Sequence, residues 1–148
     1  MPKFMLIIKG DQPPGEMPSE EMLAAMGSYN EDLAKAGVLV DLAALHPTAE
    51  GARVTFSGGE RTVVDGPFTG SKDLVAGYWI IEAASMAEAI EWAKQVPFET
   101  GGAHGYDRES GPEGEIEIRQ LFELDEFGEG PAVDRARELE KELTQRKK

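Results

Sequence analysis

The chain has 148 residues, of which 41% are hydrophobic and 29% are charged, and its formal net charge is −13 at pH 7. These values predict one globular domain with a hydrophobic core, and the negative charge argues against nucleic acid or an anionic membrane surface as a partner. The lack of cysteine excludes disulfides, thiolate catalysis and cysteine-bound metals. No apolar run reaches the ~20 residues of a membrane helix, and residues 1–11 lack the features of a signal peptide, so we expect a cytoplasmic protein.

The first part of the chain predicts a strand, a helix and a second strand. Residues 3–9 form a continuous apolar run of strand length, which is typical of a central strand buried on both faces. A helix begins after the N-cap Ser19 and closes at Gly37. Residues 38–45 are strand-like and end before Pro47, which cannot continue a ladder of hydrogen bonds. The buried stripe of the helix is expected at four positions with helical spacing: Met22, Met26, Tyr29 and Leu33.

A hairpin and a tight corner follow. Residues 52–57 and 60–64 flank the pair Gly58-Gly59, which is a strong signal for a two-residue hairpin turn. The next four residues are Asp-Gly-Pro-Phe, and we name this segment, residues 65–68, the Asp65 corner. Its aspartate can accept backbone hydrogen bonds, its glycine can adopt a positive φ, and its proline fixes its own φ. Its phenylalanine is expected to anchor the corner in the core.

The second part of the chain predicts another strand, helix and strand. Residues 75–82 are the most apolar strand candidate of this half. A well-capped helix begins after Ser85 and is stopped by Pro97. Residues 98–114 are rich in glycine and predict a long surface loop. Residues 115–120 alternate between apolar and polar side chains, which predicts a strand with one wet face.

The order of these elements predicts an α+β fold: a ferredoxin-like βαββαβ sandwich with an extra hairpin and a C-terminal helix. A tail helix from Pro131 has a narrow apolar stripe and is expected to dock on the body or on a second subunit. We therefore divide the chain into a domain of residues 1–128 and a helical extension of residues 129–148. Two helices would cover one face of the sheet, and the apolar second face predicts a homodimer with the sheets face to face.

Lys72 and seven longer stretches occur in an order that is typical of one protein family. In chain order the stretches are residues 3–11, Leu45-His46-Pro47, Gly51-Ala52-Arg53-Val54, Asp65-Gly66-Pro67-Phe68, Gly77-Tyr78-Trp79-Ile80-Ile81, residues 88–93 and residues 114–119. Over roughly residues 1–128 the chain resembles the YCII-related proteins, in the branch named for the Asp-Gly-Pro-Phe motif. The resemblance implies a dimeric α+β barrel, a bacterial protein, and an activity that is mostly unassigned in the family. A His–Asp pair in a cleft has suggested that relatives are enzymes. The chain departs from the family pattern at residues 42–44, 70 and 73. The changes at residues 42–44 and 70 remove carboxylates near the corner, whereas Asp73 replaces the usual glutamate by another carboxylate.

The candidate catalytic residues are His46 and Asp65. His46 ends a strand inside a matched motif, and an imidazole can exchange a proton near neutral pH, which suits a general base. Alternatively, His46 only bonds a nearby carbonyl group. Asp65 either orients the imidazole or serves as the hydrogen-bond acceptor of its own turn. The second histidine, His104, lies in the glycine-rich loop and is expected in solvent.

Three further residues are candidates for substrate binding: Lys72, Trp79 and Arg119. Tyr78 and Trp79 lie on opposite faces of a strand, so one of them should line an apolar pocket and the other should be core. The two distant histidines give no metal-ligand spacing, and no glycine-rich phosphate loop is present, so we expect neither a metal nor a cofactor. The first hypothesis is a cofactor-independent enzyme that acts on a small organic molecule by proton transfer. The alternative is a non-catalytic dimer that binds a small molecule or regulates a partner protein.

Overall fold

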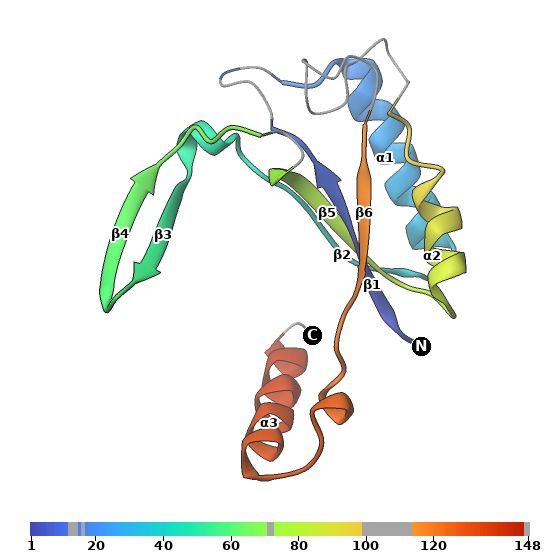
Figure 1. Ribbon diagram of the computed structural model, residues 1–148. Helices are drawn as coiled ribbons and strands as arrows, with labels where there is room; N and C mark the ends of the chain where they lie inside the picture. Colours follow the sequence, from blue (N-terminus) through green and yellow to red (C-terminus); the bar gives the residue numbers. More distant parts are fainter. Residues whose placement is uncertain (12–14, 16, 71–72, 99–113, 147–148) are drawn as a thin grey trace.

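The computed structural model describes residues 1–11, 15, 17–70, 73–98 and 114–146 (Figure 1). The elements in chain order are β1 (Lys3–Lys9), α1 (Glu20–Lys35), β2 (Leu39–Ala44), the 3₁₀ turn η1 (Thr48–Glu50), β3 (Ala52–Ser57), β4 (Glu60–Asp65), β5 (Val75–Glu82), α2 (Met86–Ala93), β6 (Ile116–Gln120), the 3₁₀ turn η5 (Leu124–Phe127) and α3 (Pro131–Arg146). Each strand and helix that the sequence predicts is therefore confirmed.

A four-stranded antiparallel sheet forms the body of the protein, in the order β2-β5-β1-β6. β1 and β5 are the central strands, as the apolar character of both segments predicts. Each half of the body is a strand–helix–strand unit, and the strand order is compatible with the ferredoxin-like arrangement. The predicted α+β fold is confirmed. The dimeric barrel concerns two copies of the chain and stays a prediction.

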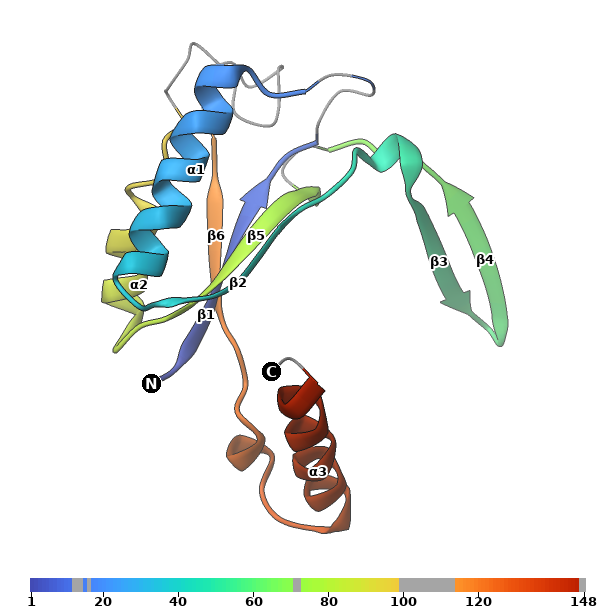
Figure 2. The same ribbon diagram turned by 180° about the vertical axis from the view of Figure 1, so that it is seen from behind.

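The hydrophobic core lies between one face of the sheet and the helices α1 and α2 (Figures 1 and 2). α1 buries all four residues of its predicted stripe. Its N-cap is Ser19, whose hydroxyl oxygen accepts a hydrogen bond from the backbone N–H of Met22 at 3.1 Å. Ser85 caps α2 in the same way, at 3.2 Å from the backbone nitrogen of Glu88. The largest fully buried side chains come from both layers: Phe4, Leu6, Met22, Leu33 and Ile81.

Tyr29 and Trp79 connect the sheet to both helices. Their rings meet edge to face, with centroids 5.1 Å apart. The Tyr29 hydroxyl donates a hydrogen bond to the carbonyl oxygen of Trp92 at 2.8 Å, and the Trp79 indole N–H donates to Oδ1 of Asn30 at 2.7 Å. Burial raises the pKa of Tyr29 above the ordinary value for a phenol. The hydroxyl therefore stays protonated and remains a donor.

We expect Tyr29→Phe to lower the free energy of unfolding by about 1 kcal/mol at neutral pH, because the carbonyl of Trp92 loses its donor. The folded state holds Tyr29 protonated, so the stabilisation by its hydroxyl is complete below about pH 10 and is lost as the pH rises further. Urea denaturation at pH 7 and above pH 10 measures both effects. Tyr78→Phe is the control, since the Tyr78 hydroxyl bonds no other described residue. An equal loss in both variants would contradict the prediction.

The second face of the sheet is apolar at its centre and has no helix on it within the described residues. We name it the open face. Its centre consists of half-buried residues from the two central strands: Met5, Ile7, Tyr78 and Ile80. Its rim is charged, with Lys9 and Arg119 beside Asp41 and Glu117. The prediction that β1 is buried on both faces is therefore wrong for one copy of the chain, because nothing in the described structure packs on this side.

Two appendages lie on the same side of the sheet as the open face, opposite α1 and α2 (Figures 1 and 2). One is the β3–β4 hairpin, which forms its own two-stranded sheet. Its turn residues Gly58 and Gly59 have φ of 55° and 83°, which confirms the predicted tight hairpin. The other appendage is α3, which contacts η5 through an ion pair of 2.8 Å between Arg137 and Asp125. α3 buries none of its residues. Among the helices of the described ranges, none has both the length and the apolar character of a membrane span.

Candidate functional site

Three segments that are distant in the sequence meet at η1. The Asp11 carboxylate follows β1 and accepts two hydrogen bonds from Thr48, from the backbone N–H at 2.9 Å and from the hydroxyl at 2.6 Å. The Thr48 hydroxyl oxygen in turn accepts a hydrogen bond from the backbone N–H of Phe68 at 3.0 Å. Asp11 therefore fixes η1 to the body, and Thr48 fixes the Asp65 corner to η1. We name this set of contacts the Asp11–Thr48 network.

Gly66 places the corner directly against η1. Its backbone N–H donates to the carbonyl oxygen of Gly51 at 2.9 Å, and the Gly66-Pro67 peptide bond is cis. A Cβ atom at Gly66 would overlap the carbonyl group of Thr48. The expected positive φ at Gly66 is not observed, because φ is positive at other glycines but not at this one. Glycine is required here for the close approach of two backbone segments.

His46 follows β2 and is held by a carboxylate that the sequence hypothesis did not include. Its Nδ1 lies 3.2 Å from Oε2 of Glu50, across the single turn of η1. The His46 side chain is 83% exposed and that of Glu50 is 59% exposed. The imidazole thus has one nitrogen engaged by a carboxylate and the other nitrogen, Nε2, open to solvent.

Asp65 is the last residue of β4 and pairs with Ala52 at the base of the hairpin. Its side chain is exposed, and within the described residues no hydrogen bond or ion pair joins its carboxylate to His46. The structure therefore brings His46 together with Glu50, and it places Asp65 on the neighbouring segment of the corner. The spacing of His46 and Glu50, four residues apart across a helical turn, is the sequence signal for this pair.

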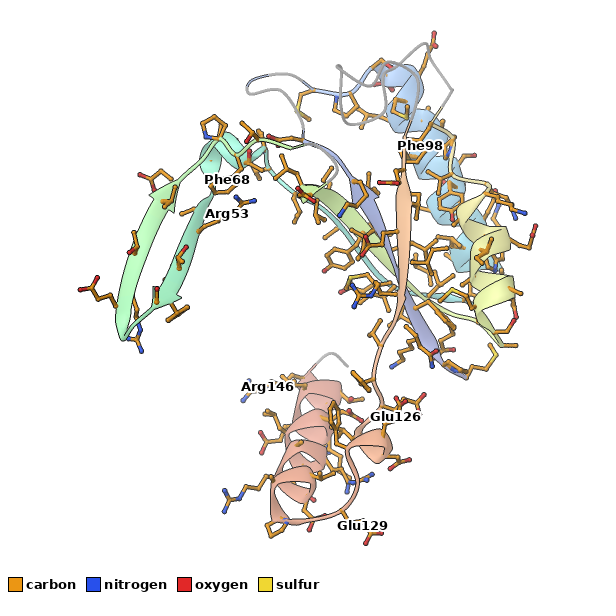
Figure 3. All side chains as sticks on the ribbon, in the orientation of Figure 1. Arg53, Phe68, Phe98, Glu126, Glu129 and Arg146 are labelled. Atoms are coloured by element: carbon orange, nitrogen blue, oxygen red, sulfur yellow. The ribbon has the colours of Figure 1, made fainter. Side chains whose placement is uncertain are left out.

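Arg53 covers the aromatic side chain of the corner. Its guanidinium carbon lies 3.9 Å from the centroid of the Phe68 ring, which is a cation–π contact (Figure 3). Phe68 was expected to anchor the corner in the core. It is instead half-buried, because the core ends before the corner and a guanidinium covers the ring. Within the described residues no carboxylate lies within 4.0 Å of the Arg53 side chain.

The predicted substrate-binding residues lie apart from this corner. Trp79 is 4% exposed and belongs to the core, while Tyr78 faces the open face, which answers the question of which aromatic side chain is core. Arg119 pairs with Met5 on the open face, and its Nη1 lies 3.4 Å from Oε2 of Glu117. Lys72 and His104 lie outside the described residues. In the part of the chain that the structure describes, no group of three His, Asp or Glu side chains is placed to hold a metal ion.

Comparison with known proteins places the corner and its surroundings in a family. The profile of the YCII-related domain matches residues 3–107, which include η1, the hairpin and the Asp65 corner. The chain belongs to the YCII-related domain family. An uncharacterized protein of Rhizobium meliloti (strain 1021) is 32% identical to it over 77 residues. That alignment covers 52% of this chain and 62% of the relative, so the chain spans less than two thirds of the relative's length.

Proposed function

We propose that this YCII-related protein is a cofactor-independent enzyme that transfers a proton on a small organic molecule bound at the Asp65 corner, with His46 as the general base. The observation that carries the proposal is the His46–Glu50 pair. A carboxylate that accepts a hydrogen bond from Nδ1–H fixes the neutral tautomer of the imidazole, and it leaves the lone pair of Nε2 free to accept a proton. The same carboxylate stabilises the imidazolium ion once the proton has moved.

The sequence predicts that Asp65 orients the imidazole; we give that role to Glu50 and propose Asp65 as a second carboxylate of the site. It lies at the end of β4, one residue before the close approach of Gly66 to η1. Its side chain is exposed and is therefore accessible to a bound molecule. We expect Asp65 to contact the substrate or the imidazolium, while Glu50 orients the imidazole.

Arg53 supports a substrate with a carboxylate or another anionic group. A guanidinium offers a planar set of donors that matches a carboxylate, and Arg53 is held in place by Phe68 without a protein carboxylate as its partner among the described residues. Phe68 is itself fixed by Thr48, two residues after His46. Arg53 and His46 are thus connected through the same rigid corner.

The alternative is a non-catalytic domain that binds a small molecule or regulates a partner protein. The exposure of the His46 side chain favours this alternative, since an acid–base site usually excludes water. In that case the Asp65 corner would bind an anion through Arg53 without chemistry at His46.

We also propose that the protein is a homodimer in which the open faces of two copies meet. The apolar centre of the open face is the support for this proposal, because a contiguous apolar patch on a soluble domain marks an interface. Sedimentation equilibrium at micromolar concentration is expected to give twice the mass of the chain. A monomer mass would contradict the proposal.

The proton-transfer proposal can be tested before the substrate is known. A thermal-shift screen of small carboxylic acids, lactones and ring compounds identifies molecules that bind. Each bound compound is then incubated with the protein in D₂O, and exchange of its C–H protons is followed by ¹H NMR. We expect His46→Ala to slow this exchange by about 10²- to 10⁴-fold, the usual contribution of a general base, and to leave the thermal shift unchanged.

His104→Ala is the matched control, since it removes the other histidine of the chain and is expected to change neither reading. A compound that binds but exchanges no proton with the wild-type protein would favour the binding domain. Exchange that is equally fast in His46→Ala would exclude His46 as the base.

A further inference from the structure

The β3–β4 hairpin has one apolar face and one polar face. The cross-strand pairs place Val54, Val63 and Phe56 on the first face, with exposed fractions of 52%, 64% and 69%. The pairs Thr55–Thr62 and Ser57–Glu60 lie on the other face. Arg61 and Asp65 also lie on the first face, and the guanidinium carbon of Arg61 is 5.4 Å from the centroid of the Phe56 ring. Both strands are exposed along their whole length, so no other element covers this face within the described residues.

A hairpin of this kind needs a partner to keep its shape. Two isolated antiparallel strands are marginally stable in water, and at least a third strand or a packed layer is needed for independent stability. The β3–β4 ladder is nevertheless regular from Ala52–Asp65 to Ser57–Glu60. The Asp11–Thr48 network holds the base of the hairpin, but it does not reach the apolar face.

The position of the hairpin indicates where the partner lies. The hairpin is on the same side of the sheet as the open face, and the helices α1 and α2 are on the other side (Figures 1 and 2). A molecule that packs on the open face therefore stands next to the hairpin. In a two-fold symmetric dimer each copy supplies an open face and a hairpin. A single interface can therefore cover both open faces and both hairpins.

The charges of these two surfaces also suit a second copy of the same chain. The chain as a whole carries a net charge of −13, which opposes self-association unless the contact surfaces are neutral. The hairpin is neutral, because Arg53 and Arg61 balance Glu60 and Asp65. The open face is neutral as well, because Lys9 and Arg119 balance Asp41 and Glu117, and Lys3 is paired with Glu82. A partner that recognises this protein by its negative charge would find no net negative charge on either surface.

We propose that the β3–β4 hairpin is a dimerisation arm, whose apolar face packs against a second copy of this chain when the two open faces meet. This inference rests on the proposed homodimer and adds to it a contact that the open face alone does not require. The arm ends at Asp65, which lies on the apolar face opposite Ala52, so its docking brings this residue of the candidate site to the subunit interface, while Arg53 stays on the polar face.

Adjacent valines on opposite faces of β4 offer a matched test. Val63 lies on the apolar face with Val54, and Val64 lies on the polar face opposite Arg53. Valine and threonine have nearly the same shape, but a threonine buried in an interface carries a hydroxyl that loses its water. We expect Val63→Thr to raise the dimer dissociation constant about ten-fold or more, and Val64→Thr to change it less than about two-fold. Sedimentation velocity over a dilution series measures both constants.

Hydrogen exchange of the wild-type protein gives a second reading that requires no variant. The backbone N–H groups of the β3–β4 ladder are expected to exchange slowly above the dissociation constant and rapidly below it, because docking stabilises the arm. The amides of β1 serve as the internal control, since β1 is paired on both sides within one copy. A wild-type monomer at all concentrations would overturn both the homodimer and the arm. A dimer with equal constants for Val63→Thr and Val64→Thr, or with hairpin exchange independent of concentration, would overturn the arm alone.

Discussion

Gly66→Ala is expected to lower the free energy of unfolding by about 3 kcal/mol and to detach the Asp65 corner from η1. The added Cβ would overlap the carbonyl group of Thr48, and backbone atoms cannot rotate away from it as a side chain can. Overpacking costs about 1–3 kcal/mol, and a clash with fixed backbone belongs at the upper end of that range. Urea denaturation measures the loss of stability. Hydrogen exchange at the Phe68 amide, which donates to Thr48, reports the detachment of the corner.

Gly51→Ala is the matched control for this prediction. A Cβ at Gly51 would lie 3.5 Å from the same carbonyl oxygen, which is an ordinary contact distance. The φ of Gly51 is −106°, in the extended region that alanine adopts freely. We expect the free energy of unfolding to change by less than about 0.5 kcal/mol, and the hydrogen exchange of the Phe68 amide to stay the same. If the two variants were equally destabilised, the close approach at Gly66 would not explain its glycine.

The parts of the fold that depend on neighbours in the sequence were predictable. The apolar stripe of α1, its N-cap Ser19 and the hairpin turn at Gly58 and Gly59 each follow from local spacing, and the structure has all three. The depth of burial was not predictable in the same way. An apolar run such as Lys3–Lys9 predicts burial on both sides, but a single copy of the chain covers only the side that faces α1 and α2.

The sequence indicates which segments hold the candidate site, but the contacts between them were not predictable. The Asp-Gly-Pro-Phe sequence marks the corner, and His46 lies on the segment that leads into η1. The contacts that build the site join residues far apart: 37 positions separate Asp11 from Thr48, and 20 positions separate Thr48 from Phe68. No local pattern predicts such pairs. The residues around Asp11 indicate only a loop after β1 and give no sign of its partner Thr48. Glu50 could have been found, since its spacing from His46 is that of one helical turn.

Asp11→Ala is expected to cost about 3 kcal/mol of unfolding free energy, because it removes both acceptors of the Thr48 backbone N–H and hydroxyl. A hydrogen bond to a charged group contributes about 1.5–3 kcal/mol, and the Thr48 groups are partly buried and lose their partner together. Asp11→Asn is expected to lose about half as much, since its single amide oxygen can still accept from one of the two donors. Urea denaturation of the three proteins gives the series.

The same series tests whether Asp11 acts on the site through η1. His46 and Glu50 flank η1, so loosening Thr48 is expected to disturb the distance of 3.2 Å between His46 Nδ1 and Glu50 Oε2. The ¹⁵N chemical shifts of the His46 ring report this directly, because the bond to Glu50 selects the tautomer with hydrogen on Nδ1. We therefore expect the His46 ring shifts of Asp11→Ala to approach those of a second variant, Glu50→Ala. Neither substitution changes His46 itself.

Asp41→Ala is the control for charge. This substitution also removes one carboxylate from a chain with a net charge of −13. Within the described residues the Asp41 carboxylate accepts one hydrogen bond, an exposed one from the backbone N–H of Leu42 at 2.9 Å. We expect the free energy of unfolding to fall by less than about 1 kcal/mol, and the ¹⁵N shifts of the His46 ring to stay unchanged. Asp11→Ala and Asp41→Ala relieve the same overall repulsion, so the difference between them isolates the Asp11–Thr48 network. Equal stabilities in these two variants would mean that η1 holds its position without Asp11.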